Sequence, residues 1–165
     1  MIIRPLSAED DLRELVELSR AFFAEYQGHH AEFFNVEDLR DDDILAFFSR
    51  SLGSEDHRTF LALDGGRIVG YITVAIRSQA PFYQVRRYGT ISGLMVQPAY
   101  RRQGVARGLM AEAVAFFAER GVRYYTVYTA VANEGALRFY EQEGLAPLQT
   151  VLIGRVDPKA RDGAS

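Results

Sequence analysis

The segment LMVQPAYRRQGVARGLM, residues 94–110, constrains the fold more than any other part of the sequence. An apolar stretch typical of a strand runs into Pro98, an arginine-bearing loop follows, and apolar residues recur at helical spacing after Gly104. A strand that turns through such a loop into a helix leaves free backbone N–H groups at the positive end of the helix dipole. The segment therefore predicts an anion site, most plausibly for a pyrophosphate, at the N–H groups of residues 103–107. The surrounding arginines are Arg101, Arg102 and Arg107. A glycine-containing turn with solvated arginines is the alternative.

Two common nucleotide sites do not fit this segment. The phosphate loop of nucleotide hydrolases has the pattern GxxxxGK followed by Ser or Thr, and the only lysine of the chain is Lys159. A dinucleotide site needs GxGxxG and an acidic residue near the end of the next strand. Here Ala106 takes the place of a glycine, and the strand expected at residues 122–130 has no carboxylate. The sequence thus argues against both sites.

Hydrophobic periodicity and turn residues predict a mixed sheet covered by helices. The predicted order is βααβββαβαβ, which places helices on both faces of the sheet and defines an α/β (α+β) fold class. The expected elements are strands at 2–4, on either side of a turn at 64–66, and at 88–96, 122–130 and 150–156, with helices at 10–27, before Gly53, at 104–121 and at 133–143.

Composition narrows the class of protein. The chain has 165 residues, of which 48% are hydrophobic and 25% charged, as expected for one globular domain over residues 1–165. The sequence lacks an apolar run long enough to span a membrane, and its first residues do not resemble a secretory signal. With no cysteine, thiolate nucleophiles and cysteine-bound metals are excluded. We expect a cytoplasmic protein with no membrane partner.

Charge is distributed unevenly along the chain. Residues 1–64 hold 15 acidic and 6 basic side chains, a net charge of −9, whereas residues 65–165 hold 7 acidic and 13 basic, a net charge of +6. This asymmetry predicts a cationic ligand for the first part and an anionic ligand for the second. Charges that merely solvate the first helices are the alternative.

The segment at residues 94–110 resembles the coenzyme A signature of the GNAT superfamily of acyl-CoA N-acyltransferases. The loop pattern of that family, Q/R-x-x-G-x-G/A, is matched by Arg101, Gly104 and Ala106, after the hydrophobic-x-hydrophobic triplet Leu94–Val96 and Pro98. A second family element, Asn-x-x-Ala-x-x-x-Tyr before a Gly-hydrophobic stop, is matched by Asn133, Ala136, Tyr140, Gly144 and Leu145. The predicted order of elements agrees as well, so the resemblance covers residues 2–156.

The resemblance implies a GNAT-like fold with a mostly antiparallel sheet and splayed central strands. It implies acceptor-side helices and first strands at 1–64 and an acetyl-CoA-binding core at 88–145. The implied activity is transfer of an acetyl group from acetyl-CoA to a primary amine of a small molecule or peptide, by direct attack and without a covalent acyl-enzyme. The charge asymmetry favours a cationic acceptor.

The resemblance also implies contacts with acetyl-CoA. Backbone groups of Leu94, Met95 and Val96 would bind the amides of the pantetheine arm, which Asn133 would also contact. Tyr140 would lie beside the thioester sulfur. The full predicted set for acetyl-CoA is Leu94, Met95, Val96, Arg101, Arg102, Gln103, Gly104, Val105, Ala106, Arg107, Asn133, Ala136 and Tyr140.

Catalysis needs an acid, an oxyanion donor and a base. A tyrosine stays protonated at neutral pH, so Tyr140 is predicted to donate a proton to the departing thiolate. The backbone N–H of Leu94 or Met95 is the predicted oxyanion donor, aimed by a bulge at Gly93. Many members of the family carry a glutamate base where this chain has Ser92–Gly93 or Tyr128, so the base is unassigned. The candidates are Glu25, Tyr83, Tyr88, Tyr128 or ordered water; for each side chain, core packing or a solvated surface competes with catalysis.

Other functions find less support. His29 and His30 lie near Glu25 and Glu32, but no further ligand follows at metal-site spacing, so no metal is predicted. An acidic chain with few arginines does not favour nucleic acid. A coenzyme-A-binding sensor that has lost turnover remains the alternative to an enzyme, because the carboxylate base is missing. A homodimer paired through the last strand remains open.

Overall fold

The computed structural model describes residues 1–156. Its elements follow the predicted order up to the last helix. They are β1 (Ile2–Pro5), α1 (Leu12–Gln27), α2 (Asp41–Ser49), β2 (His57–Asp64), β3 (Arg67–Ser78), β4 (Arg87–Val96), the short 3-10 helix η1 (Pro98–Tyr100), α3 (Val105–Glu119), β5 (Tyr125–Val127) and α4 (Glu134–Gln142).

The strands form one mixed sheet in the order β1-β2-β3-β4-β5. The first three pairings are antiparallel and the pairing of β4 with β5 is parallel. A parallel pair needs a crossover connection, and α3 supplies it. Gly65 and Gly66 have φ values of 55° and 83° in the tight turn between β2 and β3, as the predicted hairpin requires. The predicted fold class is confirmed.

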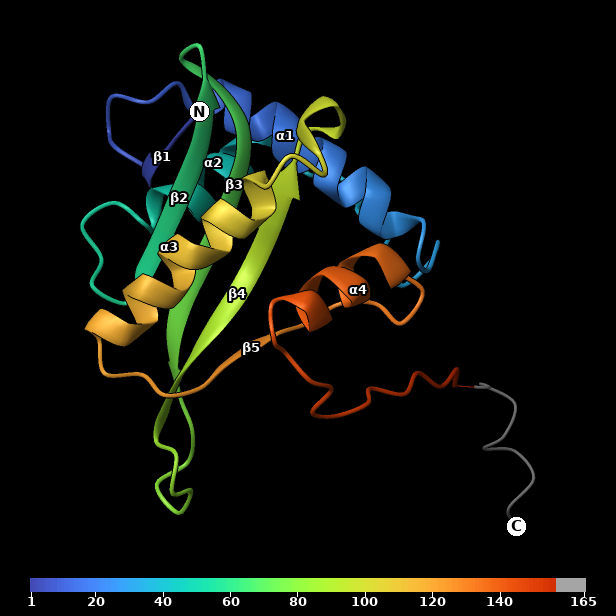
Figure 1. Cartoon of the computed structure of the whole chain (residues 1–165). Helices are drawn as coiled ribbons and strands as arrows, with labels where there is room; N and C mark the ends of the chain where they lie inside the picture. The colour runs from blue at the N-terminus through green and yellow to red at the C-terminus, as the bar shows by residue number, and fades with distance from the viewer. Residues whose placement is uncertain (157–165) are drawn as a thin grey trace.

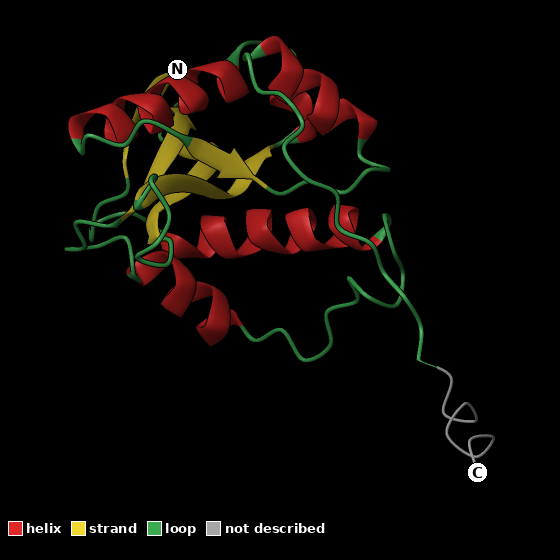
Figure 2. Cartoon of the chain, turned by 90° about the horizontal axis from the view of Figure 1, so that it is seen from below, coloured by secondary structure: helices red, strands yellow, loops and turns green. Residues whose placement is uncertain are grey.

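Two hydrophobic cores hold the helices against opposite faces of this sheet (Figure 2). On one face α1 and α2 bury Leu15 and Phe48 against strand residues such as Tyr71. On the other face α3 buries Leu109 and Met110, and α4 adds Tyr140. Because adjacent strand residues point to opposite faces, one sheet serves both cores.

Strands β4 and β5 stay together for only a short distance. Their parallel register joins Gly89 to Tyr125, Thr90 to Thr126 and Ile91 to Val127, and there it ends. Beyond this point β4 continues to Val96 paired with β3 only, while the chain after β5 turns away toward α4 (Figure 1). The splayed strands implied by the resemblance are therefore present.

Close packing fixes the point where the two strands meet. A Cβ atom added at Gly89 would lie 2.4 Å from a ring carbon of Phe117 on α3, so only glycine leaves room for this ring. The ring of Phe117 stacks on that of Tyr125 with centroids 5.4 Å apart. The place where β4 and β5 begin to separate is thus set by the stacked rings of Phe117 and Tyr125, which pack against the backbone of Gly89.

The predicted last strand at 150–156 is wrong. The chain is extended there but pairs with no strand among the described residues, and β5 is also shorter than the predicted 122–130. The side chains of Val151 and Leu152 are 73% and 88% exposed. Alternating apolar residues favour a strand, but a strand exists only where a neighbour pairs its N–H and C=O groups.

Candidate functional site

The loop before α3 presents a row of unused backbone donors. Gly104 caps α3 with a left-handed φ of 83°, and Arg102 has a φ of 60°. Within residues 1–156, no backbone N–H from Arg102 to Arg107 donates a hydrogen bond to a protein acceptor. Since these six groups surround the positive end of a helix dipole, the loop has the donor geometry of an anion site.

The arginines of this loop differ in their hydrogen-bond and ion-pair partners. Arg101 donates from Nε to the carbonyl of Val96 at 3.0 Å and pairs with Glu25 on α1 at 2.6 Å. Arg107 pairs with Glu143, after α4, at 2.9 Å. Arg102 makes no ion pair within the described residues. Arg101 and Arg107 therefore brace the loop against neighbouring segments, and the backbone supplies most of the available donors.

A bulge marks the place where β4 leaves β5. In the pairing with β3, Thr73 faces Gly93 and Val74 faces Ile91, so Ser92 is an extra residue without a partner. The predicted bulge at Gly93 is confirmed. From Ser92 to Val96 the edge of β4 that faces β5 has no partner strand. Backbone groups of Leu94, Met95 and Val96 lie along this stretch, in the position expected of groups that bind an extended chain.

Tyr140 lies on α4 and is 9% exposed. Burial, with a smaller contribution from neighbouring Tyr26, raises the pKa of Tyr140 to about 12. Burial also raises the pKa of Tyr26, which a backbone hydrogen bond with Ala130 lowers in part. A phenol in this environment keeps its proton throughout the neutral range and can act as a donor.

Asn133 begins α4 as predicted. Its side-chain Oδ1 accepts a hydrogen bond from the backbone N–H of Ala136 at 3.2 Å, which leaves the Nδ2 amide for another partner. Close by in sequence, the hydroxyl of Thr129 is buried without a hydrogen-bond partner among the described residues. Unpaired buried hydroxyls are uncommon, so this one is an exception within the described part of the chain.

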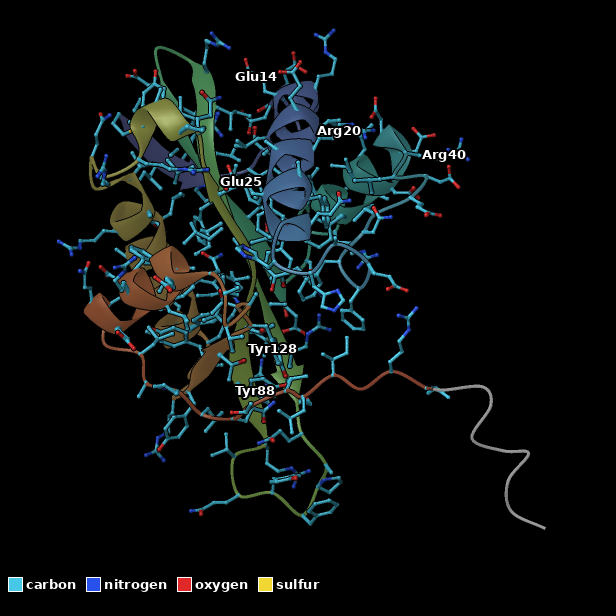
Figure 3. The ribbon with its side chains drawn as sticks, turned by 90° about the vertical axis from the view of Figure 1, so that its right-hand side faces the viewer. Glu14, Arg20, Glu25, Arg40, Tyr88 and Tyr128 are labelled. Atoms are coloured by element: carbon cyan, nitrogen blue, oxygen red, sulfur yellow. The ribbon has the colours of Figure 1, made fainter. Side chains whose placement is uncertain are left out.

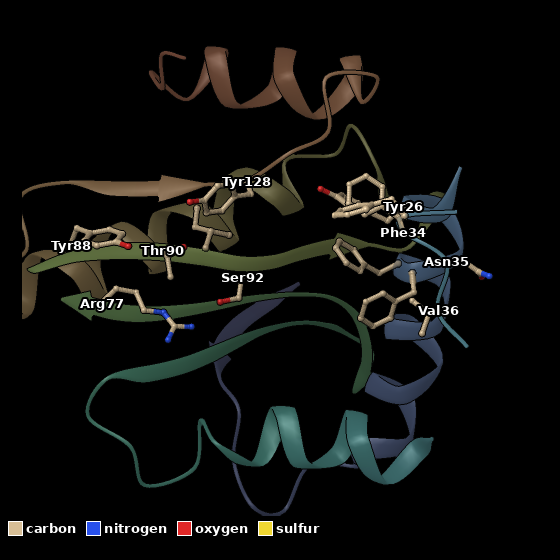
Figure 4. Close-up of a pocket in the computed structure, with 13 residues that line it drawn as sticks. Tyr26, Phe34, Asn35, Val36, Arg77, Tyr88, Thr90, Ser92 and Tyr128 are labelled. Atoms are coloured by element: carbon tan, nitrogen blue, oxygen red, sulfur yellow. The ribbon is translucent and has the colours of Figure 1, made fainter. Parts of the chain in front are cut away.

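A cavity of about 560 Å³ opens between α1 and the strands β3 and β4 (Figure 4). It collects side chains from α1, the segment after it, β3, β4 and the segment after β5. Its lining residues are Phe22, Phe23, Tyr26, Phe33, Phe34, Asn35, Val36, Arg77, Tyr88, Thr90, Ile91, Ser92 and Tyr128. This volume suits a small molecule, and most of the wall is aromatic.

The cavity separates the candidate bases into two groups. Tyr88 and Tyr128 line it and lie near one another, whereas Glu25 lies apart from them on α1 (Figure 3). Glu25 is held by Arg101, outside the lining. Tyr83 is 51% exposed in the loop before β4, beside Phe82. Of the four candidate side chains, two therefore line the cavity.

Sequence reasoning missed three polar residues of this wall, Asn35, Arg77 and Thr90. Arg77 belongs to β3, in register with Tyr88. Thr90 lies two residues after Tyr88 on β4, so both side chains point to the same face of the sheet. Only the extent of the assembled sheet decides that this face lines a cavity. The alternation of Tyr88, Thr90 and Ser92 was the available signal.

Comparison with known proteins gives the class. Residues 12–145 match the acetyltransferase (GNAT) family. The chain belongs to this family and is thereby grouped with acyl-CoA-dependent N-acetyltransferases.

Individual relatives have low sequence identity to this chain and match only part of it. Mycothiol acetyltransferase from Amycolatopsis mediterranei is 29% identical over 73% of this chain and 38% of its own length. The N-alpha-acetyltransferase RimI from Mycobacterium tuberculosis is 35% identical over 60% of this chain and 58% of its own length. The chain thus spans well under two thirds of these relatives.

Solved structures share the fold. A mutant of the BH1408 protein from Bacillus halodurans has a TM-score of 0.82 at 19% identity, with 94% of this chain and 99% of that chain covered. AAC(6')-Iy in complex with a bisubstrate analogue of coenzyme A and acetylneamine has a TM-score of 0.75 at 20% identity, with 94% and 97% covered. At these identities the likeness shows the fold alone.

The described residues were also compared with the requirements of a metal site and of a membrane-spanning helix. Residues 1–156 hold no group of three or more His, Asp or Glu side chains arranged to bind a metal ion. In the same part of the chain, no helix is both long and apolar enough to cross a membrane.

Proposed function

We propose that this chain transfers an acetyl group from acetyl-CoA to a primary amine. The observation that carries the proposal is the row of six unpaired N–H groups from Arg102 to Arg107, directly beside the splayed edge of β4. A diphosphate fits this donor set because it offers several anionic oxygens to several N–H groups. Acetyl-CoA would supply an activated acyl thioester there.

The residues around this edge have separate roles in the proposed reaction. Leu94, Met95 and Val96 would bind the pantetheine arm along the unpaired edge of β4, with Asn133 opposite. The backbone N–H of Leu94 or Met95, after the bulge, would stabilise negative charge on the thioester oxygen. The phenol of Tyr140 would hold its proton until the sulfur departs.

In the proposed transfer, the nitrogen lone pair of the neutral amine attacks the thioester carbonyl carbon, so a C–N bond forms and the C–S bond breaks. The sulfur takes a proton from Tyr140, which regains one from water. The amine nitrogen loses a proton to water in the cavity. The phenols of Tyr88 and Tyr128, which line the cavity, would relay this proton by accepting it as they pass their own to the next water.

The coenzyme-A-binding sensor is the second candidate. The observation in its favour is that no carboxylate lines the cavity, so the glutamate base found in many members of the family has no replacement of the same kind. A sensor would bind acetyl-CoA through the same loop but release no thiol when amines are added.

Calorimetry with acetyl-CoA and thiol release with a panel of amines test both candidates. An enzyme binds acetyl-CoA and releases coenzyme A in an amine-dependent manner. Tight binding without amine-dependent release favours the sensor. Absence of binding contradicts both, because each needs the loop before α3.

The sequence supports four further proposals: a single domain over residues 1–165, a homodimer, a cytoplasmic location and a cationic acceptor. For the last of these, a cationic acceptor should bind less well when acidic residues among 1–64 are reversed in charge. Several of those acids already pair with arginines, including Asp10 with Arg4 and Glu25 with Arg101.

A further inference from the structure

The aromatic cavity has one charged lining residue, and it is a cation. Arg77 lies near the end of β3, in register with Tyr88 of β4. No aspartate or glutamate contributes to the wall. The electrostatic character of this cavity is therefore opposite to the net charge of the residues 1–64 that build half of it.

Arg77 also has no side-chain partner among the described residues, whereas Arg87, the residue before Tyr88 on β4, pairs with Asp56 at 3.6 Å. Within residues 1–156, Arg77 makes neither an ion pair nor a side-chain hydrogen bond. Figure 4 shows its guanidinium reaching into the space on the side of Thr90 and Ser92. Its charge is available to whatever occupies the cavity.

We infer that the acceptor amine carries an anionic group, such as a carboxylate, on a flat apolar body. A guanidinium offers a planar pair of donors that matches a carboxylate, and the aromatic walls suit a ring. This acceptor departs from the cationic one that the charge asymmetry of the sequence favours, because a polyamine or another multiply charged cation would meet Arg77 without any carboxylate in the wall to compensate. This inference rests on the proposed function, since it takes the occupant to be the amine that is acetylated.

The strand geometry sets the distance between the two ends of this acceptor. The amine must reach the bulge at Ser92, where β4 becomes free to bind acetyl-CoA. Arg77 stands opposite Tyr88, four residues earlier, which is about 13 Å along a strand. The arginine side chain extends over part of that distance. An acceptor with the amine and the carboxylate at opposite ends of one ring fits the remainder.

The matched probes are 4-(aminomethyl)benzoate and 4-methylbenzylamine, which differ in the carboxylate alone. Because Arg77 is exposed, the chain should prefer the carboxylate compound by up to about 5-fold in KM, the upper range for a solvent-exposed ion pair. Arg77→Met should remove most of this preference, and Arg77→Lys should restore part of it. Arg86→Met is the control, because Arg86 is exposed nearby but does not line the cavity; it should keep the full preference.

The outcomes separate this inference from the proposed function. Acetylation of both probes with equal KM, or a preference that survives Arg77→Met, overturns the inference and leaves the proposed function standing. If neither probe is acetylated, calorimetry of 4-(aminomethyl)benzoate decides. Binding that is lost in Arg77→Met and kept in Arg86→Met supports the inference although transfer fails; no binding by the unaltered chain overturns it.

Discussion

The loop before α3 and the aromatic cavity are built in different ways. The loop is one continuous segment whose donors are backbone groups, freed by the left-handed conformations of Arg102 and Gly104. The cavity gathers side chains from five separate parts of the chain. A site of the first kind follows from local spacing, whereas a site of the second kind exists only after the sheet and helices have packed.

The same contrast holds for charge. In the loop, the guanidinium groups of Arg101 and Arg107 are neutralised by Glu25 and Glu143, so the backbone dipoles and the charge of Arg102 remain. In the cavity, the one charge comes from the side chain of Arg77. The net charge of a stretch of sequence therefore says little about a site within it, because internal ion pairs decide which charges face a ligand.

The largest effect is expected at Tyr140. Its neighbour Tyr26 belongs to the cavity wall, so Tyr140 lies next to that region. Tyr140→Phe removes the proposed proton donor, so kcat should fall by about 100-fold or more. The affinity for acetyl-CoA should change little, because the ring and its packing remain. Steady-state kinetics and calorimetry on the same preparation check both quantities. An undiminished kcat would end the role of Tyr140 as an acid.

The pH profile sharpens this prediction. Because the pKa of Tyr140 is raised to about 12, the phenol of the unaltered chain stays protonated throughout the neutral range. The loss of rate in Tyr140→Phe should therefore be constant from pH 6 to about pH 9. At higher pH, Tyr140 of the unfolded chain loses its proton near pH 10, before Tyr140 of the native chain does. The free energy of unfolding therefore falls as the pH rises from about 10 to 12.

The next effect is expected at Gly104, which tests the backbone-built region. A side chain has open space there, but the φ of 83° strains any residue other than glycine. Gly104→Leu should shift the N–H groups and weaken acetyl-CoA binding by about 100-fold, as two lost charged hydrogen bonds would. Calorimetry measures the loss.

Gly65→Leu is the matched control for Gly104. Gly65 also has a positive φ and open space, but it lies in the turn between β2 and β3. Both variants should lose similar stability in thermal unfolding, and only Gly104→Leu should lose affinity. Equal affinity in the two variants would show that the loop does not bind the coenzyme.

Sequence predicted most of the backbone-built region and little of the cavity. The loop, the cap at Asn133 and the bulge at Gly93 depend on local geometry that particular residues favour. The predicted last strand failed because a strand needs a partner that no local pattern supplies. Arg77 was missed for a related reason: its place in the cavity depends on its register with Tyr88, which only the assembled sheet defines.

The smallest effect is expected at Asn133, where a local cap and a ligand contact share one side chain. Its Oδ1 caps α4 through the N–H of Ala136, so Asn133→Ala should lower the free energy of unfolding by about 1 kcal/mol. Asn133→Asp keeps the capping oxygen and should keep that stability. Chemical denaturation compares the two variants.

Affinity separates the two roles of Asn133. If its Nδ2 amide donates to the pantetheine arm, both variants lose that donor, and acetyl-CoA should bind several-fold more weakly to each of them. Full affinity in the aspartate variant would restrict Asn133 to capping. The unpaired edge of β4 would then bind the pantetheine arm without an amide opposite it, and this side of the site would be made from backbone alone.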